Sequence, residues 1–349
     1  MALTRSSLSN IPTCFASCSI GCKSSHTLPK KLEAIAAAGF SAIELSFPDI
    51  LSFGSQHLGK DIDPYDYDSL CKIGEEIRKL CQDHGLKILI LQPFANFEGW
   101  PKGSKEREDA FTRAKGWIRI MQAVGTDMLQ VGSTDSPNLK PSQEEVAADL
   151  RELADLLAPH SFRIAYENWC WSSHAPGWLE VWQIVQKVDR PNVGLCLDTF
   201  QTAGGEWADP TTLSGLNELE GEHLGGRELL SVIFHESLDK LSKTVPKDKI
   251  YFLQISDAYK PKEPFENKTI DGLRPRGRWS HDFRPVPFNG GYLPVVDVAK
   301  AVLKTGFRGY FSMEVFDGGP NGKGKDYELE DFAKEAMESH KKLLDACAE

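Results

Sequence analysis

The sequence lacks three features that would each point to a particular class of protein. It has no run of about eighteen apolar residues, so no membrane-spanning helix is predicted. Residues 1–12 are polar and hold no apolar core of signal-peptide length. Lys and Arg total 40 against 50 Asp and Glu, so the formal net charge of -10 offers no basic excess for binding phosphates. These absences favour a soluble, cytoplasmic protein that acts on a small molecule, with no membrane or nucleic-acid partner.

Metal-binding and redox cysteine motifs are also missing. The chain has eight cysteines, but none of them forms a Cys-x-x-Cys pair. Cys14, Cys18 and Cys22 are each separated by three residues. Cys71, Cys81 and Cys196 lie in apolar segments, where a free cysteine behaves as a small hydrophobic residue. We therefore interpret the cysteines as packing residues.

Eight strand candidates alternate with helical patterns, and this alternation predicts a parallel sheet of α/β class. An open dinucleotide-binding sheet would show Gly-x-Gly-x-x-Gly after the first strand, whereas Gly21 stands alone there. We therefore predict a closed (β/α)8 TIM barrel that forms a single domain over residues 1–349, with a flexible amino terminus at residues 1–11. The predicted strands are Thr13–Ser17, Ala42–Leu45, Lys87–Gln92, Asp127–Val131, Phe162–Glu167, Val193–Asp198, Ile250–Ile255 and Tyr310–Val315.

Apolar residues at helical spacing predict a helix after each strand. The fourth helix follows Ser142, which forms a capping-box pattern with Glu145. Two connections, Gly204–Lys247 after strand six and Ala258–Pro294 after strand seven, are long enough to predict lids over a site. The helical patterns cover Pro29–Ala38, Leu70–Cys81, Phe111–Met121, Val146–Leu157, Leu179–Val188, Leu229–Leu241, Val295–Leu303 and Leu329–Leu344.

Strands five to eight each deliver an oxygen-bearing side chain, namely Glu167, Asp198, Gln254 and Glu314. The carboxyl ends of parallel barrel strands meet at one rim, so these side chains are expected to lie close together. Three carboxylates at one point repel each other unless a cation neutralises them. An all-oxygen set suits Mg²⁺ or Mn²⁺ better than zinc, which prefers His or Cys. The four residues are therefore predicted to bind a divalent metal.

The segments around these residues resemble the metal-site motifs of the sugar phosphate isomerase/epimerase-like TIM barrels. They are Tyr166-Glu167-Asn168, Leu197-Asp198-Thr199-Phe200, Leu253-Gln254-Ile255-Ser256-Asp257-Ala258 and Met313-Glu314-Val315-Phe316. The Gln-Ile-Ser-Asp-Ala form, together with 203–210, resembles the 3-dehydroshikimate dehydratases of fungal quinate catabolism, and the resemblance spans about Pro12 to Gly318. It implies a lyase that dehydrates 3-dehydroshikimate to protocatechuate with Mg²⁺, Mn²⁺ or Co²⁺.

The resemblance also implies a carboxylate-binding arginine and a base. Arg284, just before a Gly-rich segment, matches the arginine of the family, and its planar fork suits a carboxylate substrate. Some bacterial relatives carry a His three residues after the metal-binding Asp, where this chain has Gln201, which cannot accept a proton. His281 is the first substitute for that base, and Glu206 or a metal-bound water is the alternative.

Further residues are expected around the substrate. Gln92 and Phe94 follow the third strand and, with Gln201 and Ser256, are predicted to line the pocket, although Phe94 could instead close the barrel top. Glu44, at the end of the second strand, is an additional rim acid.

Three other functions compete with a dehydratase. A ketose isomerase or epimerase would use the same metal with two acid/base groups, but Gln254 and the Arg-bearing connection favour the dehydratase. An abasic-site endonuclease would need several His for a zinc cluster and a basic face, and a binding protein that had lost catalysis would lack a metal ligand; the sequence has none of these features. The oligomeric state is not predicted.

Overall fold

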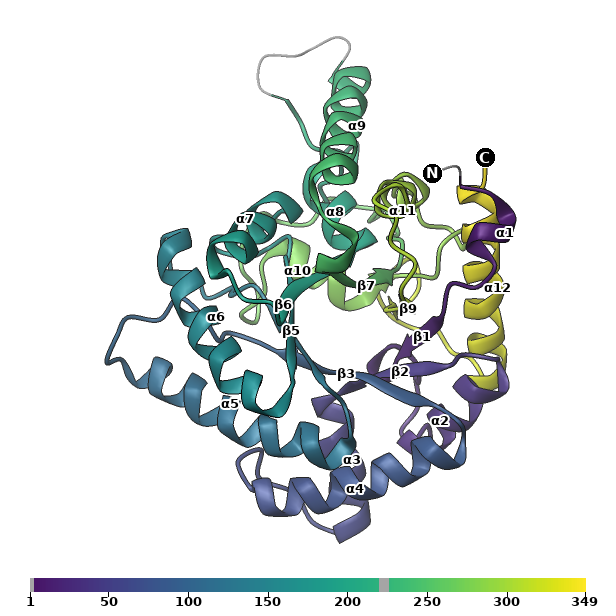
Figure 1. Cartoon of the computed structure of the whole chain (residues 1–349). Coiled ribbons are helices and arrows are strands. Elements are labelled where there is room, and N and C mark those ends of the chain that lie inside the picture. Colours follow the sequence, from purple (N-terminus) through teal and green to yellow (C-terminus); the bar gives the residue numbers. More distant parts are fainter. Residues whose placement is uncertain (1–2, 220–225) are drawn as a thin grey trace.

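The computed structural model describes residues 3–219 and 226–349, and eight parallel strands form a closed barrel in it (Figure 1). The strands follow the chain order around the barrel, and the last one pairs with β1 to close it. The predicted TIM barrel and its eight strands are thereby confirmed. The strands are β1 (Thr13–Ala16), β2 (Ala42–Ser46), β3 (Lys87–Phe94), β4 (Met128–Gly132), β5 (Arg163–Glu167), β6 (Val193–Asp198), β7 (Ile250–Ile255) and β9 (Phe311–Met313).

The predicted helices surround the barrel (Figure 1). Their apolar stripes pack on the strands; α6, for example, buries Val146, Leu150 and Leu153. The capping box is present, because Ser142 Oγ accepts the Glu145 N–H and the Glu145 carboxylate accepts the Ser142 N–H. These helices are α2 (Leu28–Ala37), α4 (Tyr67–Asp83), α5 (Lys105–Val124), α6 (Gln143–Leu157), α7 (Trp178–Val188), α9 (Gly226–Thr244), α11 (Val295–Lys304) and α12 (Leu329–Cys347).

Several shorter elements were not predicted. Two of them, α8 and the two-stranded sheet of β8 and β10, lie directly at the carboxyl rim of the barrel. The sheet pairs Arg284 with Phe316 and so brings the second long connection back to the end of the barrel. The additional elements are α1 (Arg5–Leu8), α3 (Phe47–Leu58), α8 (Thr199–Glu206), α10 (Pro275–Asp282), β8 (Phe283–Arg284) and β10 (Phe316–Asp317).

The amino-terminal segment, for which flexibility was predicted, makes contacts with the core in its described part. Leu3, Leu8 and Ile11 are buried in the core, and the Leu3 carbonyl accepts the backbone N–H of Glu349 at 2.8 Å. Burying these apolar residues favours order in this part of the chain, since it offsets the loss of chain entropy. Residues 1–2 of the segment lie outside the described residues.

The two long connections behave differently. The second, Ala258–Pro294, contains α10 and β8 and contributes Leu273, Ser280 and His281 to the wall of a cavity at the barrel rim. The first, Gly204–Lys247, contributes none of its described residues to that cavity, because it runs into α9, which projects away from the barrel (Figure 1). Its residues 220–225 lie outside the described residues. The expectation of a lid is therefore not met by the described part of the first connection.

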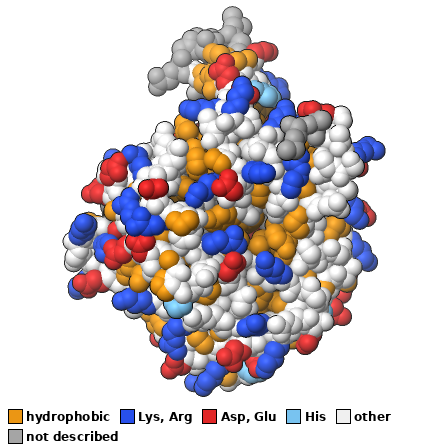
Figure 2. All heavy atoms as spheres, viewed as in Figure 1, with side chains coloured by type: hydrophobic (Ala, Val, Ile, Leu, Met, Phe, Trp, Pro, Cys, Tyr) orange, Lys and Arg blue, Asp and Glu red, His pale blue; other side chains and the backbone are white. Residues whose placement is uncertain are grey.

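Two properties of the molecule bear on its partners. None of the helices within residues 3–219 and 226–349 is both long and apolar enough to cross a membrane. On the face seen in Figure 2, basic and acidic side chains are interspersed.

His340 of α12 is a buried titratable group. It is 3% exposed, its ring centroid lies 6.1 Å from that of Phe311, and burial lowers its pKa to about 4.

Candidate metal centre and active site

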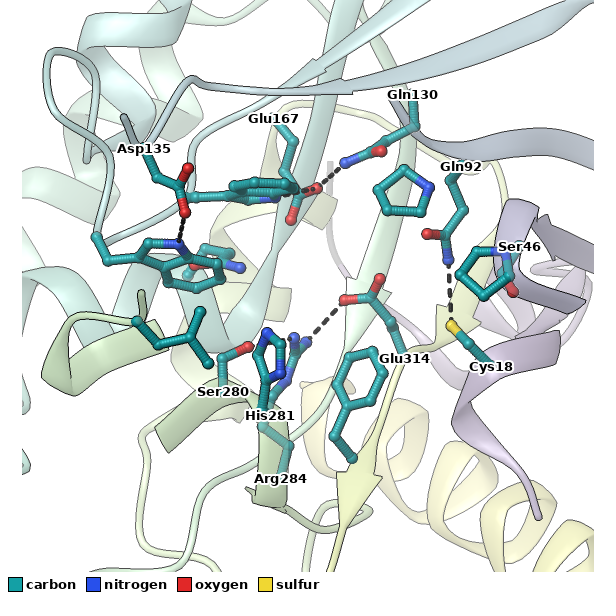
Figure 3. A pocket seen from close by; sticks show the side chains of 17 residues that line it. Cys18, Ser46, Gln92, Gln130, Asp135, Glu167, Ser280, His281, Arg284 and Glu314 are labelled. Atoms are coloured by element: carbon teal, nitrogen blue, oxygen red, sulfur yellow. Dashed lines mark hydrogen bonds and ion pairs between the residues drawn. The ribbon is translucent and has the colours of Figure 1, made fainter. Parts of the chain in front are cut away.

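A cavity of about 290 Å³ lies at the carboxyl ends of the barrel strands (Figure 3). Gln92 and Gln130 reach it from within β3 and β4, Glu167 from the end of β5, and Glu314 from the segment directly after β9. His281 and its neighbours from the second long connection form the opposite wall. The carboxyl rim is where TIM barrels gather catalytic side chains, and the volume suits a small ligand.

Three carboxylates converge at this cavity. Glu167, Asp198 and Glu314 each place one oxygen within 4.8 Å of the others, and all three residues are buried. Burial is the main reason that the pKa of each acid is raised, and the charge of Asp198 raises the pKa of Glu167 further, whereas Arg284 opposes the rise. The cluster predicted from the strand ends is therefore brought together by the barrel.

Two of these carboxylates are held by neighbouring donors. Glu167 Oε2 accepts hydrogen bonds from Gln130 Nε2 and from the indole N–H of Trp169, the latter at 3.2 Å. Its other oxygen, Oε1, is buried and has no hydrogen-bond partner among the described residues. Asp198 Oδ1 caps α8 by accepting the backbone N–H groups of Phe200 and Gln201 at 2.5 and 3.4 Å.

Arg284 is buried inside the cluster, with 1% of its surface exposed. Its Nη2 lies 2.5 Å from Asp198 Oδ2 and 3.0 Å from Glu314 Oε2, and Figure 3 shows the contact with Glu314. Its Nε donates to Ser256 Oγ at 2.9 Å, and its Nη1 donates to Ser280 Oγ at 3.3 Å. Nη2 is therefore occupied by protein acids, and an N–H of Nη1 is the group left for a ligand. Ser256, expected to line the pocket, instead supports Arg284 and is not part of the cavity wall.

Gln254 contacts the cluster through its amide nitrogen. Nε2 donates to Glu44 Oε2 at 2.8 Å and to Glu314 Oε1 at 2.9 Å, while Oε1 accepts the thiol hydrogen of Cys196 at 3.2 Å. Metal ligation through Oε1 would require the amide group to turn by half a rotation. Glu44 adds a fourth buried acid, and burial raises its pKa to about 7.

These residues fit a divalent cation. The buried carboxyl groups of Glu44, Glu167, Asp198 and Glu314 outnumber the one guanidinium, that of Arg284, which the described residues place among them. The buried Oε1 of Glu167 lacks a partner, which is the condition expected of an oxygen that a metal would satisfy. All donors are oxygens, as hard cations such as Mg²⁺ and Mn²⁺ prefer.

Three further predicted residues lie in the cavity wall. Gln92 and Gln201 are buried there, and Gln201 Oε1 accepts the Cys170 N–H at 2.9 Å. His281 lies on the wall of the second connection, and its partial desolvation lowers its pKa.

Besides Ser256, the predicted residues Glu206 and Phe94 lie outside the cavity wall. Glu206 ends α8, where its surroundings are Glu180 and Ser237, and burial raises its pKa to about 7. The cause is α8 itself, which starts at the rim and carries its last residue away from it. Phe94 is fully buried with its ring centroid 4.8 Å from that of Trp117, because the register shifts between Leu91 and Phe94. It therefore packs between the barrel and α5.

Among the residues of the cavity wall that the sequence did not reveal are Gln130, Asp135, Trp169 and Trp171. The two indole rings stack with centroids 5.3 Å apart and planes 21° apart, and Trp171 Nε1 donates to Asp135 Oδ2 at 3.1 Å. In the sequence, Gln130 could have been noticed as a polar residue inside an apolar strand. The two tryptophans could have been noticed as a Trp-Cys-Trp segment that begins two residues after Glu167.

Comparisons with known proteins agree with this arrangement. The model of the xylose isomerase-like TIM barrel family matches residues 32–343. A 3-dehydroshikimate dehydratase of Neurospora crassa is 31% identical over 321 residues, which cover 86% of this chain and 85% of that protein. A protein of the same name from Pseudomonas aeruginosa is 33% identical over 295 residues, 84% of this chain but 37% of that longer protein.

Among solved structures, a xylose isomerase-like TIM barrel/4-hydroxyphenylpyruvate dioxygenase fusion protein matches with a TM-score of 0.68 and 27% identity. The match covers 94% of this chain and 42% of the fusion protein. The chain belongs to the xylose isomerase-like TIM barrel family and is a homologue of the 3-dehydroshikimate dehydratases.

Proposed function

We propose that this protein is a metal-dependent hydro-lyase that converts 3-dehydroshikimate to protocatechuate and water. The observation that carries the proposal is the 31% identity to the Neurospora crassa enzyme over 86% of this chain. The alternative, a ketose isomerase or epimerase, is supported by the shared fold alone, and fold does not determine function. The substrate places the reaction in quinate and shikimate catabolism.

The reaction removes a proton from the carbon next to the ketone and a hydroxyl from the following carbon. The remaining dienone then becomes aromatic by shifting one more proton from carbon to the ketone oxygen, so the net change is the loss of one water. Mg²⁺, Mn²⁺ or Co²⁺ held by Glu167, Asp198 and Glu314, with Gln254 as a fourth ligand, would supply a Lewis acid for the ketone oxygen.

The chain's own residues have distinct parts in this proposal. Arg284 can donate an N–H of Nη1 to an oxygen of the substrate while its Nη2 keeps Asp198 and Glu314 in place. Gln92 and Gln201 offer amide groups to the substrate hydroxyls from the cavity wall. Gln130, Glu167 and Arg284 are buried where they line the cavity, so a substrate bound against them would displace water from the reacting carbons.

His281 is the proposed base. Its lowered pKa keeps the imidazole neutral at neutral pH, so it can accept the proton beside the ketone. The charge of Asp135, on the facing wall, favours the imidazolium that forms. The same imidazolium can return the proton to the departing hydroxyl, which then leaves as water. Glu206 has no part in this step, because it lies outside the cavity.

The test uses the ultraviolet absorption of the catechol product, which the substrate lacks. Protein loaded with Mn²⁺ should generate this absorption from 3-dehydroshikimate, chelation should abolish it, and added metal should restore it. Glu314→Gln should be inactive, whereas Glu75→Gln, which changes an exposed acid of α4, should match the unaltered protein. Folded, metal-loaded protein that leaves 3-dehydroshikimate unchanged but interconverts ketoses would refute the proposal.

A further inference from the structure

Trp169 connects the carboxylate cluster to the wall of the cavity, and the mechanism above gives it no role. It lies two residues after Glu167, on the loop that leaves β5. Its indole N–H donates to Glu167 Oε2 at 3.2 Å, and its ring forms part of the cavity wall. One side chain therefore contacts both the candidate metal ligand and the space for the substrate.

The two oxygens of Glu167 have different surroundings. Oε2 accepts two hydrogen bonds, from Gln130 and from Trp169, whereas Oε1 is buried and has no partner among the described residues (Figure 3 shows the bond to Gln130). Two donors at one oxygen fix the rotation of the carboxylate about its last bond. The unpaired Oε1 is then the oxygen left for a cation.

The position of the Trp169 ring is strongly restrained. A methyl group added at Gly132, the last residue of β4, would lie 2.2 Å from the ring, so the indole occupies space that only glycine leaves open. The ring also stacks on Trp171 with centroids 5.3 Å apart, and the N–H of Trp171 donates to Asp135. A restrained ring of this kind presents a flat apolar wall.

We propose that Trp169 is a positioning residue for Glu167 and a specificity-determining wall for carboxylates built on a flat six-membered ring. The indole N–H acts on metal affinity through Glu167, because outer donors orient the atoms that bind a metal. The ring acts on the ligand by stacking, since an aromatic face favours a flat ring. The second of these roles rests on the proposed function, whereas the first does not.

The positioning role is tested by Mn²⁺ affinity, measured by calorimetry on chelator-stripped protein without substrate. Trp169→Phe keeps an aromatic ring but removes the N–H, and it should weaken Mn²⁺ binding about tenfold. Trp171→Phe is the matched control, since it removes an indole N–H that is bound by Asp135 instead of Glu167; its Mn²⁺ affinity should stay within about twofold.

If circular dichroism shows that Trp169→Phe does not fold, Gln130→Met replaces it in this test. This variant deletes the other donor to Glu167 Oε2 and should lower the Mn²⁺ affinity by a similar factor. Mn²⁺ affinity unchanged in the folded variant, or lowered equally in Trp171→Phe, would overturn the positioning role.

The wall is tested by comparing Trp169→Leu with Trp169→Phe at saturating Mn²⁺. Phe should keep the KM for 3-dehydroshikimate, whereas Leu should raise it about fivefold with a smaller effect on kcat, and should weaken protocatechuate binding, followed by tryptophan fluorescence, by a similar factor. Equal KM and equal protocatechuate affinity in the two variants would contradict the proposed role of the Trp169 ring as a specificity-determining wall. If the unaltered protein lacks dehydratase activity, the proposed function fails, while the Mn²⁺ and protocatechuate measurements still decide the roles of Trp169.

Discussion

Metal binding should raise the thermal stability of this protein by an amount that can be worked out in advance. A ligand at about 100 times its dissociation constant stabilises the folded state by about 2.7 kcal/mol if the unfolded chain does not bind it. A chain of 349 residues has an unfolding entropy of about 0.7 kcal/mol/K, so the expected increase in Tm is about 4 °C. The source of this gain is the cluster of Glu167, Asp198 and Glu314, whose buried carboxyl oxygens a divalent cation would bind.

The assay is a thermal melt of chelator-stripped protein with and without Mn²⁺. Glu314→Gln keeps the shape of the side chain but removes a carboxylate, so its Mn²⁺-dependent increase should fall below about 1 °C. Glu75→Gln, on the exposed face of α4, should keep the full increase. An equal increase in both variants would show that Mn²⁺ binds elsewhere and would refute the assignment of the cluster.

Three other predictions follow from charged groups in the structure. His281→Asn should lower kcat/KM about 100-fold and remove the acid limb of the pH profile, which in the unaltered enzyme lies below the usual His pKa because desolvation lowers it; an identical limb in the variant would exclude His281 as the base. Arg284→Met should lower the free energy of unfolding of the metal-free protein by about 3–5 kcal/mol in urea melts, because Asp198 and Glu314 lose their buried cation. Added Mn²⁺ should recover part of this loss, and equal stability of the two proteins would contradict the buried pairing. His340 has a folded pKa of about 4, so the unfolded chain binds the proton first as pH falls, and about 3 kcal/mol of stability should be lost between roughly pH 6.5 and 4; His340→Gln should lack this loss, as the difference between the two unfolding curves would show.

The carboxylate cluster was predictable because barrel topology leaves little freedom at strand ends. Once β5, β6, β7 and β9 are parallel neighbours, the residues at their carboxyl ends must meet at one rim. Glu167, Asp198, Gln254 and Glu314 could thus be assigned from the end of an apolar run alone. The environment of each side chain was not predictable in this way, because Gln254 turns its amide nitrogen toward the acids and Arg284 places its Nη2 between them.

The position of Glu206 outside the cavity wall has a local physical cause. Gly204 and Gly205 indicated a loop leaving the strand, whereas the structure continues them as helix α8. A methyl group at Gly204 would lie 3.2 Å from Trp279, and one at Gly205 would lie 3.1 Å from Cys170, so these glycines serve close helix packing and not a turn. Eight helical residues after Asp198 advance the chain by about 12 Å along the axis, which carries Glu206 away from the cavity.

The position of Arg284 beside the acids could not be predicted from the pattern of any single strand. It is 86 residues from Asp198 in sequence, and a two-residue pairing with Phe316 in the sheet of β8 and β10 returns it to the rim. So short a pairing has no periodic signal, and its Arg284 forms ion pairs with Asp198 and Glu314 of the acid cluster. The cluster therefore helps to hold the second long connection over the cavity. Weakening the acids should loosen that connection as well as the metal site, and faster backbone hydrogen exchange at 275–284 in a folded Asp198→Asn variant would reveal it, whereas unchanged exchange there would show that the connection is held by its own packing.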